Sequence, residues 1–102
     1  MLKKLLSISF LFLISLPAFA CNSWESEFIA KATVELAGEG LCQVKISDIS
    51  NYWPHYRCPV YYHELLEDFV VKADDCTKLL NSDGTISGVA VRKDNEDFYT
   101  IE

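Results

Sequence analysis

The sequence predicts a small α+β domain that is mostly β: four or five antiparallel strands, one helix before the last hairpin, and stapling disulfide bonds. Three observations predict this class: segments in which apolar and polar residues alternate, one segment with helical periodicity, and four cysteines among 102 residues. Alternation places every second side chain on one face of a strand, whereas a helix groups residues three or four apart. A chain of this length forms one domain with a small core, so covalent cross-links are expected.

The first twenty residues have the pattern of a secretory signal peptide. Lys3 and Lys4 form a short basic region, and residues 5–16 are apolar apart from three serines. Residues 18–20 read Ala-Phe-Ala, which fits the small-x-small rule for cleavage, and the apolar run is too short to span a bilayer. We therefore expect residues 1–20 to be removed. Residues 21–102 are expected to form a single exported domain, periplasmic or extracellular, with no membrane span.

The four cysteines, Cys21, Cys42, Cys58 and Cys76, allow three disulfide pairings. No pair is spaced Cys-x-x-Cys, which argues against a zinc ribbon or a thioredoxin-like site. We favour Cys42–Cys58, which closes a loop of about 16 residues worth roughly 3 kcal/mol, and this leaves Cys21–Cys76. Cys21 also stands where a bacterial lipoprotein is acylated. Ala18 in place of a larger aliphatic residue three positions earlier, and the even number of thiols, disfavour a lipid anchor.

The first half of the domain predicts a β-hairpin followed by a loop. Residues 28–36 and 41–47 alternate between apolar and polar, and the glycine-containing segment 37–40 supplies the turn between them. Residues 48–59 contain prolines and large aromatics, and we expect a long loop there, which can include a short strand. The side chains expected to point inward are Phe28, Ala30, Ala32, Val34, Leu36, Cys42, Val44 and Ile46.

The second half predicts a helix and a final pair of strands. From Pro59 to about Ala73 the apolar residues follow a helical period, with proline tolerated in the first turn. Residues 85–92 and 98–101 alternate again, on either side of a polar turn. The expected order is strand, strand, loop, helix, strand, strand, which resembles the order in an oligonucleotide-binding-type, partly open barrel. The inner helical face is expected to carry Tyr62, Leu66, Phe69, Ala73 and Leu80.

The charge of the chain is acidic. The formal charge is −6 at pH 7, and loss of Lys3 and Lys4 with the signal peptide makes it −8. Nucleic acids and anionic lipid headgroups both select basic surfaces, so this balance argues against either as a partner. An acidic surface is compatible with a basic protein partner, although solubility alone is the simpler explanation of the charge.

The segment 52–62 is rich in aromatic side chains. Tyrosine and tryptophan offer a large contact area at a low cost in conformational entropy, and they are enriched in interface hot spots. Two interpretations stay open: these residues fill the core beneath a loop, or they form a binding surface. The candidate binding residues are Trp53, His55, Tyr56, Tyr61 and Tyr62.

No motif in the sequence predicts catalysis, a metal site or a cofactor. A cysteine nucleophile would need a free thiol beside a histidine; Cys58 lies three residues from His55, but four cysteines in an exported chain favour disulfides. His63 and Glu67 are spaced for one helix face, and a solvated face explains them more simply than zinc does. We therefore expect a protein that is not an enzyme. A weak hydrolase that uses His55 or His63 is a third hypothesis, which wild-type activity in a double alanine variant of these histidines would eliminate.

The leading hypothesis is a small exported binding protein that recognises a basic protein by surface complementarity. Inhibitors of cationic enzymes and immunity-type proteins belong to this class. The alternative is a module that binds a glycan or another small ligand through the aromatic residues of segment 52–62. The salt dependence of binding distinguishes the two hypotheses. A charge-steered protein complex associates more slowly as ionic strength rises, whereas the affinity for a glycan or small ligand depends little on salt.

Overall fold

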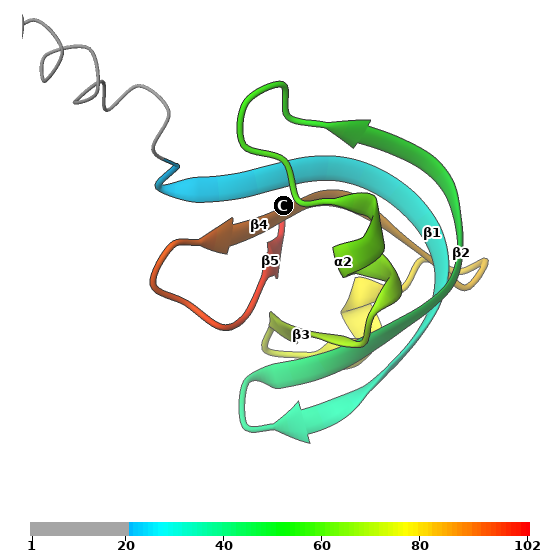
Figure 1. Ribbon diagram of the computed structural model, residues 1–102. Coiled ribbons are helices and arrows are strands. Elements are labelled where there is room, and N and C mark those ends of the chain that lie inside the picture. Colours follow the sequence, from blue (N-terminus) through cyan, green and yellow to red (C-terminus); the bar gives the residue numbers. More distant parts are fainter. Residues whose placement is uncertain (1–20) are drawn as a thin grey trace, which may run out of the picture.

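The computed structural model describes residues 21–102, so the predicted signal peptide, residues 1–20, lies outside the described part of the chain. A five-stranded antiparallel sheet curls into a nearly closed barrel (Figure 1), in the order β3-β2-β1-β4-β5. A parallel bridge from Val71 to Tyr99 joins its two edges. This confirms the predicted mostly β, partly open barrel. The strands are β1 (Ser23–Gly38), β2 (Leu41–Pro54), β3 (Phe69–Lys72), β4 (Thr85–Lys93) and β5 (Thr100–Ile101).

The first hairpin is longer than the sequence predicted. Residues 48–54, expected in a loop, continue β2 and pair with the first half of β1, from Ser26 opposite Pro54 to Lys31 opposite Asp48. The prediction was wrong because the alternation in β2 is interrupted twice. The register shifts leave Ser47 and Ser50 as extra residues on β2, which are β-bulges. Each serine hydroxyl donates a hydrogen bond to a β1 carbonyl, and such bulges bend the strands into a barrel.

Most of the predicted inward-facing residues form the core. Phe28, Ala30 and Val44 are fully buried, and Ile46 is nearly so. Leu36 is an exception, since it is 75% exposed at the tip of the hairpin, where a register shift precedes the turn. The hairpin tip therefore extends beyond the core that organises the rest of the sheet.

The predicted helix is much shorter than expected. Only Tyr62–Leu66 form a helix, α2, and Phe69–Lys72 form β3 instead of a continued helix. Phe69-Val70-Val71 is rich in β-branched residues, which favour strands, and it pairs with residues 41–44 of β2. Leu65 is the buried residue of α2, whereas Tyr62 and Leu66 are exposed, so the predicted inner face was wrong within the helix. Phe69 and Leu80 do pack in the core, but from outside α2. In Figure 1, α2 lies across the mouth of the curled sheet.

A short 3-10 helix, Cys76–Leu79, links β3 to β4. The Asp75 carboxylate accepts hydrogen bonds from the amide and hydroxyl of Thr77, and these lower the pKa of Asp75. This turn lies between the third and fourth strands, after the segment 59–73 in which we expected the longer helix. Among residues 21–102, no helix has the length and hydropathy needed to cross a membrane.

Two disulfides cross-link the barrel, but in a pairing different from the one we favoured. Cys21 is bonded to Cys58, and Cys42 to Cys76. Cys42 lies opposite Val71 of β3 in the sheet register, so the segment that follows β3 brings Cys76 back to it. The antiparallel hairpin also sets the start of β1 beside the end of β2, where the Glu25 amide donates to the Cys58 carbonyl, 2.9 Å away. The spacing of the cysteines along the chain does not reveal that either of these pairs lies close together in the fold.

A buried polar contact ties the segment before α2 to β1. The Ser26 hydroxyl, 2% exposed, donates to the Val60 carbonyl at 2.8 Å and accepts from the Val60 amide at 2.9 Å. The Tyr52 hydroxyl donates to the same carbonyl at 2.6 Å. Because Val60 is fully buried, these side chains replace the backbone partners that an irregular segment lacks.

Replacing Ser26 with alanine is expected to cost about 1–3 kcal/mol of unfolding free energy, because the Val60 amide is then buried without an acceptor. Urea unfolding followed by circular dichroism measures this cost as a lower midpoint with an unchanged m-value. Ser50→Ala is the control, since the Ser50 hydroxyl also bonds to a carbonyl but is exposed. Equal losses in the two variants would contradict the role given to Ser26.

Candidate functional site

Trp53 lies on the outer face of the sheet, near the end of β2. It is 48% exposed and stands directly opposite Glu27 of β1 in the register. The preceding residue, Tyr52, points the other way, into the barrel, because successive strand residues face opposite sides. Trp53 is therefore a surface residue, fixed by the strand that carries it.

The neighbours of Trp53 are acidic and apolar side chains from three strands. Glu27 is paired with Trp53 on one side and with Val89 of β4 on the other, and Glu25 precedes it by two residues. Together with Ser26, Pro54 and His55, these residues line a shallow hollow of about 130 Å³. We call it the Trp53 hollow. It combines an aromatic face with two carboxylates on one rigid sheet.

His55 and Tyr56 lie beyond β2, in the loop that carries Cys58. The His55 ring stacks on Tyr56, with centroids 4.8 Å apart, and the Arg57 guanidinium lies 5.6 Å from the Tyr56 centroid. The Nδ1 of His55 accepts from the amides of Arg57 and Cys58, at 3.2 and 3.1 Å. These hydrogen bonds use Nδ1 as an acceptor, so the imidazole caps the two amides of this loop.

Tyr61 and Tyr62 lie at the start of α2 and form a different surface. Tyr62 makes an edge-to-face contact with Tyr52, with centroids 5.3 Å apart, and Tyr61 stacks on His63. Both tyrosines remain about half exposed. The Tyr61 amide donates to Glu64 Oε2 at 2.7 Å, which fixes the first turn of this short helix.

The five candidate binding residues therefore do not form one patch. Trp53 and His55 line the Trp53 hollow, Tyr56 extends from the disulfide-bonded loop at 83% exposure, and Tyr61 and Tyr62 belong to α2. Tyr52 separates the last group from Trp53, because it occupies the inner face of the strand between them. Of the three surfaces, the Trp53 hollow sets an aromatic ring of β2 beside two carboxylates of β1.

A second aromatic and acidic cluster is occupied by the protein's own arginine. The Arg92 guanidinium lies 4.6 Å from the Trp24 ring centroid and 3.6 Å from Glu64 Oε1. Both charged side chains are three-quarters or more buried, and Tyr99 donates to Glu64 at 3.3 Å. Burial and the nearby Glu64 charge raise the pKa of Tyr99. The hollow beside this cluster, about 340 Å³, is rimmed by Glu67, Asp68, Glu96 and Asp97.

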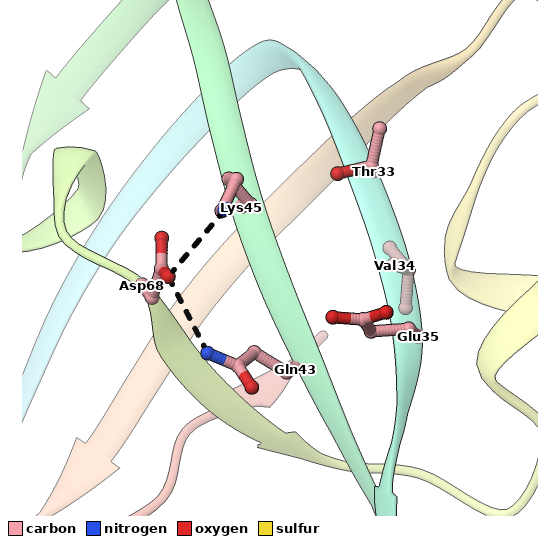
Figure 2. A pocket seen from close by; sticks show the side chains of 6 residues that line it. All are labelled: Thr33, Val34, Glu35, Gln43, Lys45 and Asp68. Carbon is pink, nitrogen blue, oxygen red and sulfur yellow. Dashed lines mark hydrogen bonds and ion pairs between the residues drawn. The ribbon is translucent and has the colours of Figure 1, made fainter.

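The hollow in Figure 2 lies on the outer face of β1 and β2, next to the start of β3. Asp68 Oδ2 lies 3.9 Å from Lys45 Nζ and accepts a 3.5 Å hydrogen bond from Gln43 Nε2. Three of the polar side chains that line this hollow therefore bind one another. Its lining residues include no aromatic ring, and the cavity measures about 290 Å³. It offers no stacking platform for a sugar or a base. Across residues 21–102, no group of three or more metal-ligating side chains comes together.

The sequence did not identify Glu25, Glu27 and Val89 as partners of Trp53. The predicted first strand began at residue 28, whereas β1 begins at Ser23. Extending the alternation of residues 28–36 backward would have set Glu25 and Glu27 on the outer face. No pattern in the sequence indicated that Glu27 pairs with Trp53, because the bulges at Ser47 and Ser50 interrupt the alternation of β2.

The fold and these surfaces define a disulfide-bonded five-stranded barrel with an aromatic and acidic hollow on its outer face. No protein-family model, curated protein or solved structure matches the chain. The chemistry of its surface is accordingly the basis for assigning a function.

Proposed function

We propose that residues 21–102 act as an exported binding protein that recognises a basic protein through the acidic surface and the Trp53 hollow. One observation carries the proposal. Of the fifteen aspartates and glutamates, only Glu64 and Asp68 lie within 4.0 Å of a cationic side chain in residues 21–102. The negative charge is therefore largely unneutralised and available to a partner.

An unneutralised surface of one sign acts on an oppositely charged partner before contact. It raises the association rate, and it selects against acidic proteins by repulsion. Solubility alone accounts for the net charge, but not for a half-exposed tryptophan framed by carboxylates. Aromatic anchors of this kind provide much of the binding energy in protein interfaces.

Export is supported by the covalent structure. Both disulfides are typical of proteins in an oxidising compartment, and the described residues contain no membrane-spanning helix. The bond between Cys21 and Cys58 supports a form of the protein in which the Cys21 sulfur carries no lipid. These features agree with a released protein that meets its partner in the periplasm or outside the cell. Inhibitors and immunity-type proteins act in this way.

The proposal predicts a salt-sensitive complex with a basic protein. Oxidised residues 21–102, immobilised at low salt, are expected to retain one stoichiometric basic protein from envelope and culture extracts and to release it in a salt step. The purified partner is then expected to associate about tenfold more slowly when the ionic strength is raised from 0.01 to 0.15 M, with a smaller change in the dissociation rate.

Trp53→Ala is expected to weaken that complex by more than about tenfold, the loss typical of a hot spot. Leu36→Ala is the matched control, since Leu36 is also apolar and exposed but lies at the hairpin tip. A partner whose affinity is the same with both variants would refute the role of Trp53. Binding of a glycan with no salt dependence would refute the basic partner and support the alternative module.

A further inference from the structure

We propose that the Trp53 hollow is a receptor for an arginine side chain, with the guanidinium stacked on Trp53 and paired with Glu27 and Glu25. The inference rests on the proposed function and specifies what the basic partner must present at this surface. It is carried by the side chains that line the hollow and by an internal contact of the same chemistry elsewhere in the protein.

That internal contact is the Arg92 cluster. Here the chain holds its own guanidinium against an indole ring, 4.6 Å from the Trp24 centroid, with a carboxylate oxygen at 3.6 Å. Trp24 and Arg92 are direct partners across β1 and β4. An indole face attracts a cation through the ring quadrupole, and a carboxylate beside the ring adds a charged partner.

The Trp53 hollow presents the same groups without the cation. Trp53 is the direct partner of Glu27 across β1 and β2, so their Cβ atoms are about 5 Å apart. Glu25 lies on the same face. Among residues 21–102 its carboxylate accepts one hydrogen bond, a 3.4 Å bond from the Ser23 hydroxyl. Neither carboxylate has an ion-pair partner among residues 21–102.

Four other aromatic rings of the described chain already carry a cation. Arg92 lies over Trp24 and Tyr99, Arg57 over Tyr56, and Lys72 over Phe98. Trp53 has no such contact in residues 21–102, although it is half exposed and flanked by two carboxylates. On the outer face, an indole ring and two carboxylates therefore lie together without a cation.

Shape and hydration favour arginine over lysine. A planar guanidinium stacks on an indole while its N–H groups reach carboxylates at the side, whereas an ammonium is a compact, strongly hydrated charge. His55, which also lines the hollow, uses its Nδ1 to accept from the amides of Arg57 and Cys58 rather than to bind a carboxylate.

The test is an NMR titration of oxidised, ¹⁵N-labelled residues 21–102 with N-acetyl-arginine amide. Saturable shifts are expected at the Trp53 indole N–H and at the amides of Glu25 and Glu27. The signal of the Trp24 indole N–H is expected not to shift, because Arg92 already covers that ring. N-acetyl-citrulline amide has nearly the same shape without the charge, and it is expected to bind about tenfold more weakly.

Variants decide which side chains are responsible. Glu27→Gln and Trp53→Ala are each expected to weaken arginine binding about fivefold, whereas Trp53→Phe keeps a ring and retains more of it. Glu39→Gln is the matched control, because Glu39 is an exposed carboxylate in the hairpin turn, away from the hollow. Equal binding of arginine and citrulline, or equal effects of Glu27→Gln and Glu39→Gln, would overturn the proposal.

The same variants separate this inference from the proposed function. A captured basic partner that binds Glu27→Gln and Trp53→Ala as tightly as the unmodified protein would leave the proposed function intact and refute the arginine receptor. Arginine binding at Trp53 without any basic protein partner would leave the receptor intact and refute the proposed function.

Discussion

Replacing Gly88 with alanine is expected to destabilise the barrel by at least about 2 kcal/mol, out of about 5–15 kcal/mol for a typical domain. Gly88 has φ of 139°, and a Cβ placed there would lie 2.7 Å from the Glu102 carbonyl oxygen and 2.9 Å from Ile101 Cγ2. The oxygen belongs to backbone that pairs with Val89, so relief of the clash breaks hydrogen bonds between β4 and the end of the chain. Urea unfolding measures the loss.

Gly40→Ala is the control for the effect of the backbone angle. Gly40 lies in the hairpin turn with φ of 71°, and a Cβ there would meet nothing within 4 Å. Its replacement is expected to cost only about 1–2 kcal/mol, the penalty of a left-handed residue with a side chain. If Gly88→Ala cost no more than Gly40→Ala, the close approach of residues 101 and 102 to β4 would not be a source of stability.

Removing the Cys42–Cys76 disulfide is expected to cost more than removing Cys21–Cys58. The residues are 34 apart in one bond and 37 apart in the other, so chain entropy alone predicts about 4 kcal/mol for each. Cys42 is fully buried within the sheet, however, while Cys21 and Cys58 are partly exposed. Losing the Cys42 sulfur also leaves a small void, worth about 1 kcal/mol.

The double variants Cys42→Ala/Cys76→Ala and Cys21→Ala/Cys58→Ala are the pair to compare, since each removes one bond without leaving a free thiol. Thermal unfolding is expected to give the lower midpoint for the first. Equal midpoints would show that the two cross-links act through the unfolded chain alone. A lower midpoint for the second would place the more important cross-link at the start of β1.

The parts of the fold that could be predicted are those in which local pattern and tertiary position agree. Residues 28–36 and 41–47 alternate, and the structure pairs them as a hairpin with Phe28 and Val44 inside. Residues 85–92 are part of β4, as their alternation predicted. In each case the period of two was uninterrupted, so one face could be assigned to the core without knowledge of the neighbouring strands.

Long-range pairing produced the errors. Residues 69–72 fit a helical period as well as a strand, and pairing with β2 decided between them. The disulfides follow from that same pairing and from the full length of the hairpin, neither of which the spacing of the cysteines reveals. The choice of Cys42–Cys58 relied on a short loop, but the fold brings Cys42 close to Cys76 instead.

The candidate site was predicted in part. Trp53 and Tyr56 are exposed aromatic residues, as expected of a binding surface, whereas the aromatic residues of segment 52–62 divide among three surfaces. The sequence could identify a tryptophan worth testing. It could not identify Glu25 and Glu27 as its neighbours, because that contact depends on how β2 resumes its register beyond the two bulges.

The Cys21–Cys58 bond has a consequence for recognition as well as for stability. It fastens the segment after β2 to the start of β1, next to the His55 cap and the Trp53 hollow. A surface that is already held in one conformation gives up little conformational entropy when a partner docks, so more of the contact energy remains as affinity. Formation of this disulfide would therefore complete the preorganisation of the surface before any partner docks.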